Sequence, residues 1–347
     1  MTVDDGGGPM ILEVDALQIH YSTRAGAVRA VDGASFAVPE GRIVGLVGES
    51  GCGKTTAVRA IMGVLAENGR RAGGRVVFRG QAIDEAATRK LLWRDIAYVP
   101  QSAMSSLDPV YTVGAQLVEV LTKRGNASRS AARARAAELF ELVGLSESRL
   151  SDYPHQFSGG MRQRAAIAMA LALKPSLLLA DEPVTALDVI VQRQILDMLR
   201  TLQQRLRLSM VLVTHDISVV AYLCDDVVVM YAGQVIESGP VREVLARPRH
   251  PYTMGLRNAF PDLMSDALEL VPIGGSPPDL SDPPPGCRFA PRCPFVRAAC
   301  TTSAALIAGG GQQIHASACL RNDEAFSLRK AAMDPATWQR SSSYATS

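Results

Sequence analysis

The sequence contains no apolar run long enough to cross a lipid bilayer. Its longest apolar stretch, residues 165–180, is broken by Lys174-Pro175, whereas a membrane-spanning helix needs roughly 18 to 20 uninterrupted apolar residues. The first residues include Asp4, Asp5 and three glycines, and they lack the basic segment followed by an apolar one that marks a secretory signal. We therefore expect a chain that stays in the cytoplasm and has no membrane span of its own.

A strong charge imbalance is also absent. The chain has 36 Lys and Arg against 34 Asp and Glu, a formal net charge of +2. A nucleic-acid-binding protein is usually much more basic, so the overall charge predicts no nucleic-acid partner. The length of 347 residues and the apolar content of 47% suffice to bury the core of one large or two moderate domains.

The hydrophobic pattern divides the chain into segments of different secondary structure. Residues 11–47 alternate apolar and polar side chains, with turn-like breaks at Gly26, Gly33 and 39–41, which predicts antiparallel strands followed by a buried strand. Residues 84–156 have a mostly helical pattern and read as an inserted helical subdomain.

From residue 163 onward, helical and strand patterns alternate, which predicts a mostly parallel sheet covered on both faces. The sequence predicts a helix ending at 173, a strand at 177–180, a helix at 189–206, a strand at 210–214 and a hairpin at 226–237.

One glycine-rich segment matches the phosphate-loop pattern G-x-x-x-x-G-K-[ST]. It lies between an apolar strand at 43–47 and a predicted helix, and it reads Gly48-Glu49-Ser50-Gly51-Cys52-Gly53-Lys54-Thr55. Glycines leave the backbone N–H groups open to phosphate oxygens, and the helix N-terminus adds its positive dipole end. We expect Lys54 to reach the β- and γ-phosphates of ATP, the Thr55 hydroxyl to ligate Mg²⁺, and Thr56 to complete the nucleotide-binding set.

Two adjacent carboxylates, Asp181 and Glu182, end the apolar strand at 177–180. Open α/β sheets bind ligands at the carboxyl ends of their strands. In such a place Asp181 would hold Mg²⁺ and Glu182 would act as the general base that polarises the attacking water. The alternative is a solvated strand end with two surface acids.

Residues 153–164 read YPHQFSGGMRQR and resemble the signature sequence of ABC transporter ATPases. The signature itself is Ser158-Gly159-Gly160-Met161-Arg162-Gln163, and Phe157 stands where the family usually has leucine. The resemblance extends from residue 11 to about 320. It implies an α/β fold with a P-loop NTPase (RecA-like) core, an antiparallel β subdomain, the helical insert and a small C-terminal cysteine-bearing tail.

Other elements of that family follow in the expected order, and the resemblance assigns each a role. Tyr21 would stack on adenine, Gln101 would lie near Mg²⁺ and the attacking water, Asp188 would belong to the D-loop, and His215 would contact the γ-phosphate. Each residue also has an ordinary alternative. These are a core aromatic for Tyr21, a plain loop residue for Gln101, a helix N-cap for Asp188 and a satisfied histidine for His215.

In this family two cassettes pack head to tail, so Ser158, Gly159, Gly160 and Gln163 of one subunit would close over the nucleotide of the other. The resemblance therefore implies a second ABC ATPase subunit, identical or related. Three stretches, residues 106–109, 153–155 and 250–253, resemble the oligopeptide, dipeptide and nickel importer branch.

Membership of that branch implies two transmembrane permease subunits and, indirectly, an extracytoplasmic solute-binding protein. The chain would then be a translocase subunit bound peripherally at the cytoplasmic face of the inner membrane, with the helical insert as the docking surface. A non-hydrolysing regulatory ABC subunit and a non-transport ABC ATPase remain as alternatives. Without an internal repeat or a long coiled-coil insertion, the sequence favours a single transport cassette.

Four cysteines crowd the C-terminal end with the spacing C-x5-C-x6-C-x18-C: Cys287, Cys293, Cys300 and Cys319. The spacing resembles the C-terminal motif of the importer branch, which in some members is associated with a [4Fe-4S] cluster. Four thiolates can close such a cluster. A zinc site and free or regulatory thiols are the alternatives. We expect an ATPase cassette over residues 10–260 and a cysteine-bearing extension over 261–347.

Overall fold

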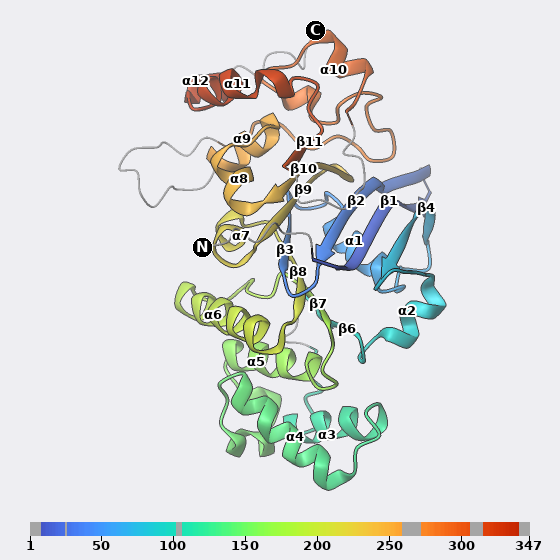
Figure 1. Ribbon diagram of the computed structural model, residues 1–347, viewed down its shortest axis with the longest axis vertical. Coiled ribbons are helices and arrows are strands. Elements are labelled where there is room, and N and C mark those ends of the chain that lie inside the picture. The colour runs from blue at the N-terminus through green and yellow to red at the C-terminus, as the bar shows by residue number, and fades with distance from the viewer. Residues whose placement is uncertain (1–7, 25, 102–105, 259–271, 306–314, 340–347) are drawn as a thin grey trace. The chain divides into compact units, whose positions relative to one another are not determined.

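The structure is a computed structural model and describes residues 8–24, 26–101, 106–258, 272–305 and 315–339. Figure 1 labels the helices and strands, and the chain divides into two compact units. The first comprises Met1–Ala37, Val44–Ile83 and Thr214–Ser347, and the second comprises Val38–Ile43 and Asp84–Val213. The expected boundary between residues 260 and 261 lies outside the described residues.

An antiparallel sheet forms one layer of the first unit, in the order β2-β1-β4-β5. Its strands are β1 (Met10–Thr23), β2 (Gly26–Pro39), β4 (Gly69–Phe78) and β5 (Gln81–Ile83). Alternate residues of β1 are buried, as expected for a strand with one face on a core. The predicted break at Gly33 is wrong, because β2 continues through this residue; glycine tolerates the left-handed φ of 79° found there.

A second set of strands in the first unit carries the phosphate loop. Strand β3 (Ile43–Val47) is fully buried and pairs in parallel with β9 (Asp226–Tyr231). Strand β9 forms the predicted hairpin with β10 (Gln234–Pro240) around Ala232-Gly233. The helices of this part are α1 (Lys54–Ile61), α7 (Ile217–Leu223), α8 (Val241–Ala246) and α9 (Pro251–Asn258).

The described part of the tail is built from short elements. They are η4 (Ala290–Arg292), α10 (Ala298–Thr302), β11 (Ala316–Ser317), η5 (Asn322–Glu324), α11 (Ala325–Ala332) and α12 (Pro335–Gln339). Strand β11 pairs with β10, and α11 packs on α9. The tail is therefore joined to the strands of the first unit by backbone hydrogen bonds.

Parallel strands β6 (Ile96–Val99), β7 (Leu177–Asp181) and β8 (Ser209–Thr214) lie side by side in the second unit. Helix α6 (Val189–Leu206), β7 and β8 agree with the sequence prediction to within one residue. Strand β6 was not predicted, because its four residues lie inside a segment whose pattern is helical. The chain thus has the mixed α/β architecture expected from the sequence.

The helices of the second unit mostly begin at a residue whose side chain accepts a hydrogen bond from a backbone N–H of the first turn, which satisfies one of the four N–H groups that a helix start leaves open. These helices are α2 (Glu85–Leu91), α3 (Val113–Lys123), α4 (Arg129–Leu142), α5 (Gly159–Ala170) and α6, with short turns at η2 (Glu147–Ser151) and η3 (Pro154–Gln156).

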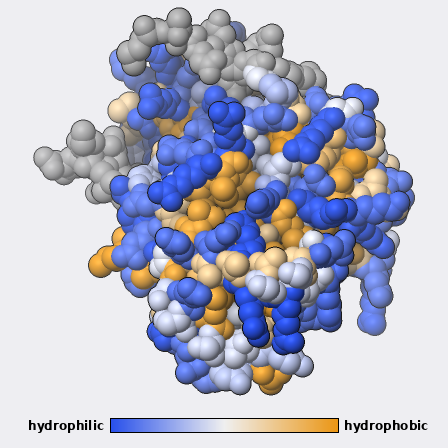
Figure 2. Space-filling view, turned by 60° about the horizontal axis from the view of Figure 1, so that its bottom comes forward, coloured by the Kyte–Doolittle hydropathy of each residue, from blue (hydrophilic) through white to orange (hydrophobic). Residues whose placement is uncertain are grey.

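No helix among the described residues is long and apolar enough to span a membrane. On the face drawn in Figure 2, apolar side chains form small groups separated by hydrophilic ones. This surface pattern agrees with the interrupted apolar runs of the sequence.

Candidate functional site

The phosphate loop connects β3 to α1 in the first unit, as predicted. Helix α1 starts after Gly53 without a side-chain cap, so its first N–H groups are left for a ligand. Ser50 and Gly51 at the tip of the loop are exposed, whereas Gly48 and Cys52 are buried. The loop therefore offers backbone donors at the surface while its ends are fixed inside.

Close packing explains two glycines of the loop. A Cβ atom on Gly48 would lie 2.1 Å from the Met230 carbonyl oxygen, and one on Gly53 would lie 2.3 Å from the Ala30 carbonyl oxygen. Gly53 also has φ of 102°, in the region that favours glycine. Any larger residue at either position would displace the loop from the strands beneath it.

The Lys54 ammonium group folds back over the loop. Its Nζ donates to the Gly48 carbonyl at 2.7 Å and to the Glu49 carbonyl at 2.8 Å, and it lies 3.6 Å from Cys52 Sγ. Lys54 is buried, and burial is also the main cause that raises the pKa of the Cys52 thiol. A cation held in this way is placed for an anionic ligand above the loop.

In the second unit, the two predicted carboxylates end β7. Asp181 is buried and accepts a hydrogen bond from the Tyr98 hydroxyl at 3.3 Å. The Glu182 carboxylate accepts hydrogen bonds from Gln101 Nε2 at 2.8 Å and from Thr185 Oγ1 at 3.0 Å. The structure thus brings together Glu182 and Gln101, residues 81 positions apart, and adds Thr185, which the sequence analysis did not single out.

The backbone around Glu182 is unusual. Glu182 has φ of 47° and Ala186 has φ of 63°, conformations that non-glycine residues rarely adopt. Such outliers persist only where the surroundings hold them, and they gather at functional sites. The Glu182 N–H donates to the Val213 carbonyl at 2.8 Å, which fixes the backbone of this residue.

Tyr21 and His215 both lie in the first unit. Tyr21 is half-buried near the end of β1, where its ring covers Gly69. His215 is exposed directly after β8. Tyr21 is therefore not a fully buried core aromatic, and His215 lies at the carboxyl end of a strand.

The signature residues start α5 in the second unit. Ser158 is exposed and caps the helix by accepting a hydrogen bond from the Met161 N–H. Gly160 packs closely on α6, because a Cβ there would lie 2.5 Å from Val191 Cγ1. Gln163 is buried. Asp188 caps α6 through the Val191 N–H, which is the ordinary alternative given for it above.

The four tail cysteines lie near one another without forming a ligand set. Burial raises the pKa of Cys293 to about 12 and that of Cys319 to about 11, and charges on neighbouring thiols act in the same direction. Among the residues that the structure describes, no three His, Cys, Asp or Glu side chains come together as a metal-binding group. The iron-sulfur and metal-binding predictions therefore find no support in this geometry, since a metal needs deprotonated thiolates at bonding distance.

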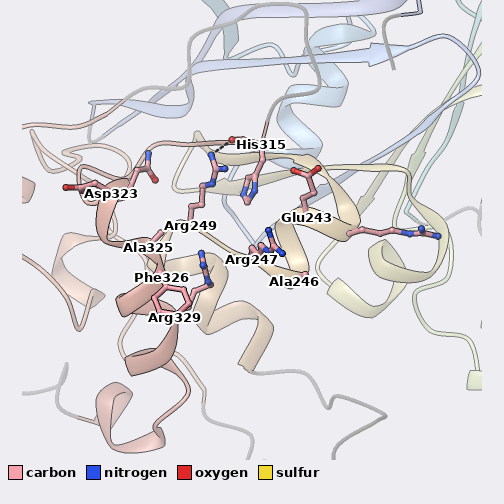
Figure 3. Close-up of a pocket in the computed structure, with 11 residues that line it drawn as sticks. Glu243, Ala246, Arg247, Arg249, His315, Asp323, Ala325, Phe326 and Arg329 are labelled. Carbon is pink, nitrogen blue, oxygen red and sulfur yellow. Dashed lines mark hydrogen bonds between the residues drawn. The ribbon is translucent and has the colours of Figure 1, made fainter. Parts of the chain in front are cut away.

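A cavity of about 690 Å³ lies between part of the tail and α8 with the residues that follow it (Figure 3). Arginines line both sides. Arg249 donates to the His315 carbonyl and Arg329 donates to the Pro248 carbonyl at 3.2 Å. None of the predicted site residues lines this cavity. Its arginines hold the tail against the rest of the first unit.

Comparisons with known proteins agree with these observations. Residues 31–185 match the family model described as ABC transporter, and residues 236–300 match the one described as oligopeptide/dipeptide transporter, C-terminal region. The chain is 44% identical over 296 residues to the dipeptide transport ATP-binding protein DppD of Bacillus subtilis, covering 84% of this chain and 88% of that protein.

The protein of the same name from Escherichia coli is 43% identical over 295 residues, covering 84% of this chain and 90% of its own. Among solved structures, a dimeric bacterial ABC transporter cassette, MJ0796, superposes with a TM-score of 0.59 at 28% identity and covers 67% of this chain and 99% of its own. CbiO1 of Clostridium perfringens, part of the transporter complex cbiONQ, gives a TM-score of 0.60 at 27% identity, with coverages of 72% and 96%.

Proposed function

Because the chain belongs to the ABC transporter family, in which it is an ATP-binding and ATP-hydrolysing subunit of a peptide importer, we propose roles for its individual residues. The phosphate loop, residues 48–55, with Thr56 binds the nucleotide phosphates, and Tyr21 stacks on the adenine. Residues 10–260 form the cassette and residues 261–347 the extension. What supports the loop assignment is the uncapped start of α1 beside the folded-back Lys54.

Turnover depends on the side chains that end β7. Glu182 is the general base that accepts a proton from the attacking water, Gln101 orients its carboxylate, and His215 contacts the γ-phosphate. The hydrogen bond of 2.8 Å between Gln101 and Glu182 is the observation that carries this assignment, because it holds the carboxylate in one direction. Oxygen donors at Thr55, Gln101 and Asp181 suit Mg²⁺, which when bound neutralises phosphate charge.

Replacing Glu182 by Gln tests the assignment. The amide keeps the shape of the side chain and cannot accept the proton, so turnover should fall by about 10²- to 10⁴-fold while ATP binding persists. Turnover is measured as phosphate release from the assembled transporter, and binding by calorimetry. Glu243→Gln, on the exposed surface of α8, is the control. Unchanged turnover in Glu182→Gln would reject the general base, because phosphate release would then not depend on this carboxylate.

The working unit is a head-to-tail pair of ABC ATPase subunits, and the dimeric relatives of this fold support that proposal. Ser158, Gly159, Gly160 and Gln163 of one subunit, with Asp188, would close over the nucleotide of the other. Ser158 is exposed at the start of the 12-residue helix α5, and a helix start favours an anion. Glu182→Gln should therefore accumulate a closed dimer with ATP, detectable by light scattering.

The permease partners that the family implies need a docking surface. We assign it to the helical insert, where α3, α4 and η2 line a cavity of about 630 Å³ and Val110 and Tyr111 are exposed nearby. A groove of this kind suits a short helix of a permease. The subunit would then be held at the cytoplasmic face of the inner membrane, with the solute-binding protein acting from the other side.

The Tyr111→Ala variant tests the docking surface. We expect it to reduce peptide uptake and the amount of subunit recovered with permease-containing membranes, while nucleotide binding is retained. Leu206→Ala, which changes an exposed apolar residue at the end of α6, is the matched control. Equal recovery of Tyr111→Ala and wild-type protein with the membranes would show that the docking surface does not include Tyr111.

A finer proposal concerns Cys287, Cys293, Cys300 and Cys319, which would hold a [4Fe-4S] cluster. Their number and spacing support it, and the absence of a ligand group among the described residues speaks against it. Anaerobically purified protein should then be brown with broad absorbance near about 400 nm. Colourless, iron-free protein would reject the cluster and leave zinc or free thiols.

A further inference from the structure

The C-terminal tail is anchored to the first unit at several separate points. Residues 316–317 pair with β10, and His315 Nε2 lies 2.6 Å from the buried carboxylate of Glu237. The Arg29 N–H donates to the Leu280 carbonyl at 2.9 Å, and arginines cross the cavity of Figure 3. A tail fixed in this way can hold other groups of the unit in place.

Arg292 extends from the tail directly to the phosphate loop. It forms a bidentate ion pair with Glu49, at 2.8 Å from Nη1 and 3.0 Å from Nη2. Its remaining N–H groups donate to the Tyr231 hydroxyl and to the carbonyls of Gly274 and Ile273. All five guanidinium donors are therefore used, and the side chain is only 6% exposed.

Aromatic rings surround this ion pair. The Arg292 guanidinium lies 5.7 Å from the ring centroid of Tyr231 and 6.0 Å from that of Phe289, and Tyr252 packs against both rings. Rings at these distances attract the cation and exclude water, so the ion pair is screened less than one on the surface.

Glu49 connects the ion pair to the nucleotide-binding groups. Its backbone N–H donates to the Tyr252 hydroxyl at 3.0 Å, and its carbonyl accepts from Lys54 Nζ at 2.8 Å. The position of Glu49 therefore sets the position of Lys54. The carboxylate is also a negative charge within the loop that must receive an anionic triphosphate, and unless it is neutralised it would oppose binding.

A second tail arginine supports the other side of the loop. Buried Arg288 bonds to Asp32 and to the Ala232 carbonyl in the turn between β9 and β10. The next residue in that turn, Gly233, donates its N–H to the Cys52 carbonyl at 2.9 Å. Two arginines that flank the tail residues 289–291 thus reach the loop, one directly and one through the turn.

We propose that Arg292 is a positioning residue for nucleotide binding, which neutralises Glu49 and keeps the phosphate loop in the form that accepts ATP. Through Arg292 the tail becomes part of the nucleotide site, although it does not contact the nucleotide. This inference rests on the role proposed above for the phosphate loop. It assigns the tail a function that does not depend on whether its cysteines hold a metal.

Substitutions of both partners test the proposal by Mg-ATP binding to the full-length chain. Arg292→Gln leaves the carboxylate of Glu49 unpaired and should raise the Kd by about tenfold. Adding Glu49→Gln removes that carboxylate, so the double variant should recover to within about threefold of Glu49→Gln alone. If Arg292 had a merely structural role, the double variant would bind Mg-ATP no better than Arg292→Gln, because it would lose at least as many contacts.

Arg321→Gln is the matched control, since Arg321 also forms a bidentate pair with a glutamate of the tail, Glu324, at 3.0 and 2.5 Å. Its Kd for Mg-ATP should stay at the wild-type value. Wild-type affinity in Arg292→Gln would overturn the inference. So would a double variant whose Kd for Mg-ATP is no lower than that of Arg292→Gln. Weaker Mg-ATP binding by Lys54→Ala would show separately that the loop itself binds the nucleotide.

If Arg292→Gln does not fold, Arg292→Lys keeps the charge and removes the bidentate geometry. We expect the KM for ATP to rise by about threefold with kcat unchanged, because the residue acts on binding and not on the reacting atoms. An unchanged KM, or a fall of kcat alone, would reject the positioning role.

Discussion

The phosphate loop and the carboxylate end of β7 are held in different ways. The loop is fixed by buried groups from distant parts of the chain, since Tyr252 and Arg292 reach Glu49 from 203 and 243 residues away. The Glu182 carboxylate is held at the surface by exposed Gln101 and Thr185. The partners of the first region are buried, whereas the side chains that donate to Glu182 in the second are exposed.

This difference fits the tasks of the two regions. A binding loop gains affinity when it is already in its bound form, because less conformational freedom is lost on association. A general base must change its surroundings once in every cycle, and regions of low local stability supply such movements. The comparison predicts that changes near the loop alter affinity and stability, while changes near Glu182 alter turnover.

The largest effect on nucleotide affinity should come from Lys54→Ala. Removing the ammonium group takes away the cation that lies over the loop carbonyls, and we expect the Kd for Mg-ATP to rise by about a hundredfold, or about 2.7 kcal/mol. Calorimetric titration of the full chain measures the Kd, with a change at an exposed residue of α11, Lys330→Ala, as control. Wild-type affinity in Lys54→Ala would mean that the loop is not the binding region.

The buried support of the phosphate loop can be tested through the pH dependence of stability, because it includes the buried His250. Burial lowers its pKa from 6.5 to about 3, in agreement with its Nδ1 accepting a hydrogen bond from the Tyr252 N–H. Since the unfolded chain takes up this proton near pH 6.5 and the folded chain does not, stability is fully present above that pH and is lost as pH falls toward 3. From pH 7.5 to 5 the loss should be about 2 kcal/mol.

The His250→Asn variant should remove most of this acid sensitivity, because asparagine can accept a similar hydrogen bond and does not titrate. Urea unfolding at pH 7.5 and 5 measures the change, and exposed His155→Asn should keep the wild-type pH dependence. If the stability of His250→Asn falls with pH as much as that of the wild type, protonation of His250 is not the cause of the acid sensitivity.

What could be predicted from the sequence depended on how local the signal was. The phosphate loop occupies eight consecutive residues, and its chemistry follows from their types alone. The 18 residues of α6 carry a clear periodicity between Asp188 and Arg207, so both ends of that helix were predictable. No local pattern indicates the pairing of Glu182 with Gln101, since the family resemblance places Gln101 near Mg²⁺ and the attacking water.

Long-range contacts could not be predicted. Nothing in the pattern around Arg292 indicates Glu49 as its partner, because an ion pair between such distant positions depends on the folded tail. The His-Pro-Tyr-Thr stretch at 250–253 indicates the importer branch, but no local pattern indicates that its tyrosine hydroxyl accepts a hydrogen bond from the phosphate loop. The cysteine spacing, conversely, suggested a metal site that the described geometry does not support.

The smallest effect should come from Thr185→Val, which tests the exposed hydrogen bonds around Glu182. Valine keeps the shape of threonine and removes the hydroxyl that donates to Glu182 at 3.0 Å. Since an exposed neutral hydrogen bond contributes about 1 kcal/mol or less, kcat should fall by about threefold with the Kd for ATP unchanged. Thr122→Val, which removes a hydroxyl that donates to backbone carbonyls of α3, should retain wild-type kcat. A raised Kd for ATP in Thr185→Val would show that the residues around Glu182 also affect binding, against the predicted division between binding and turnover.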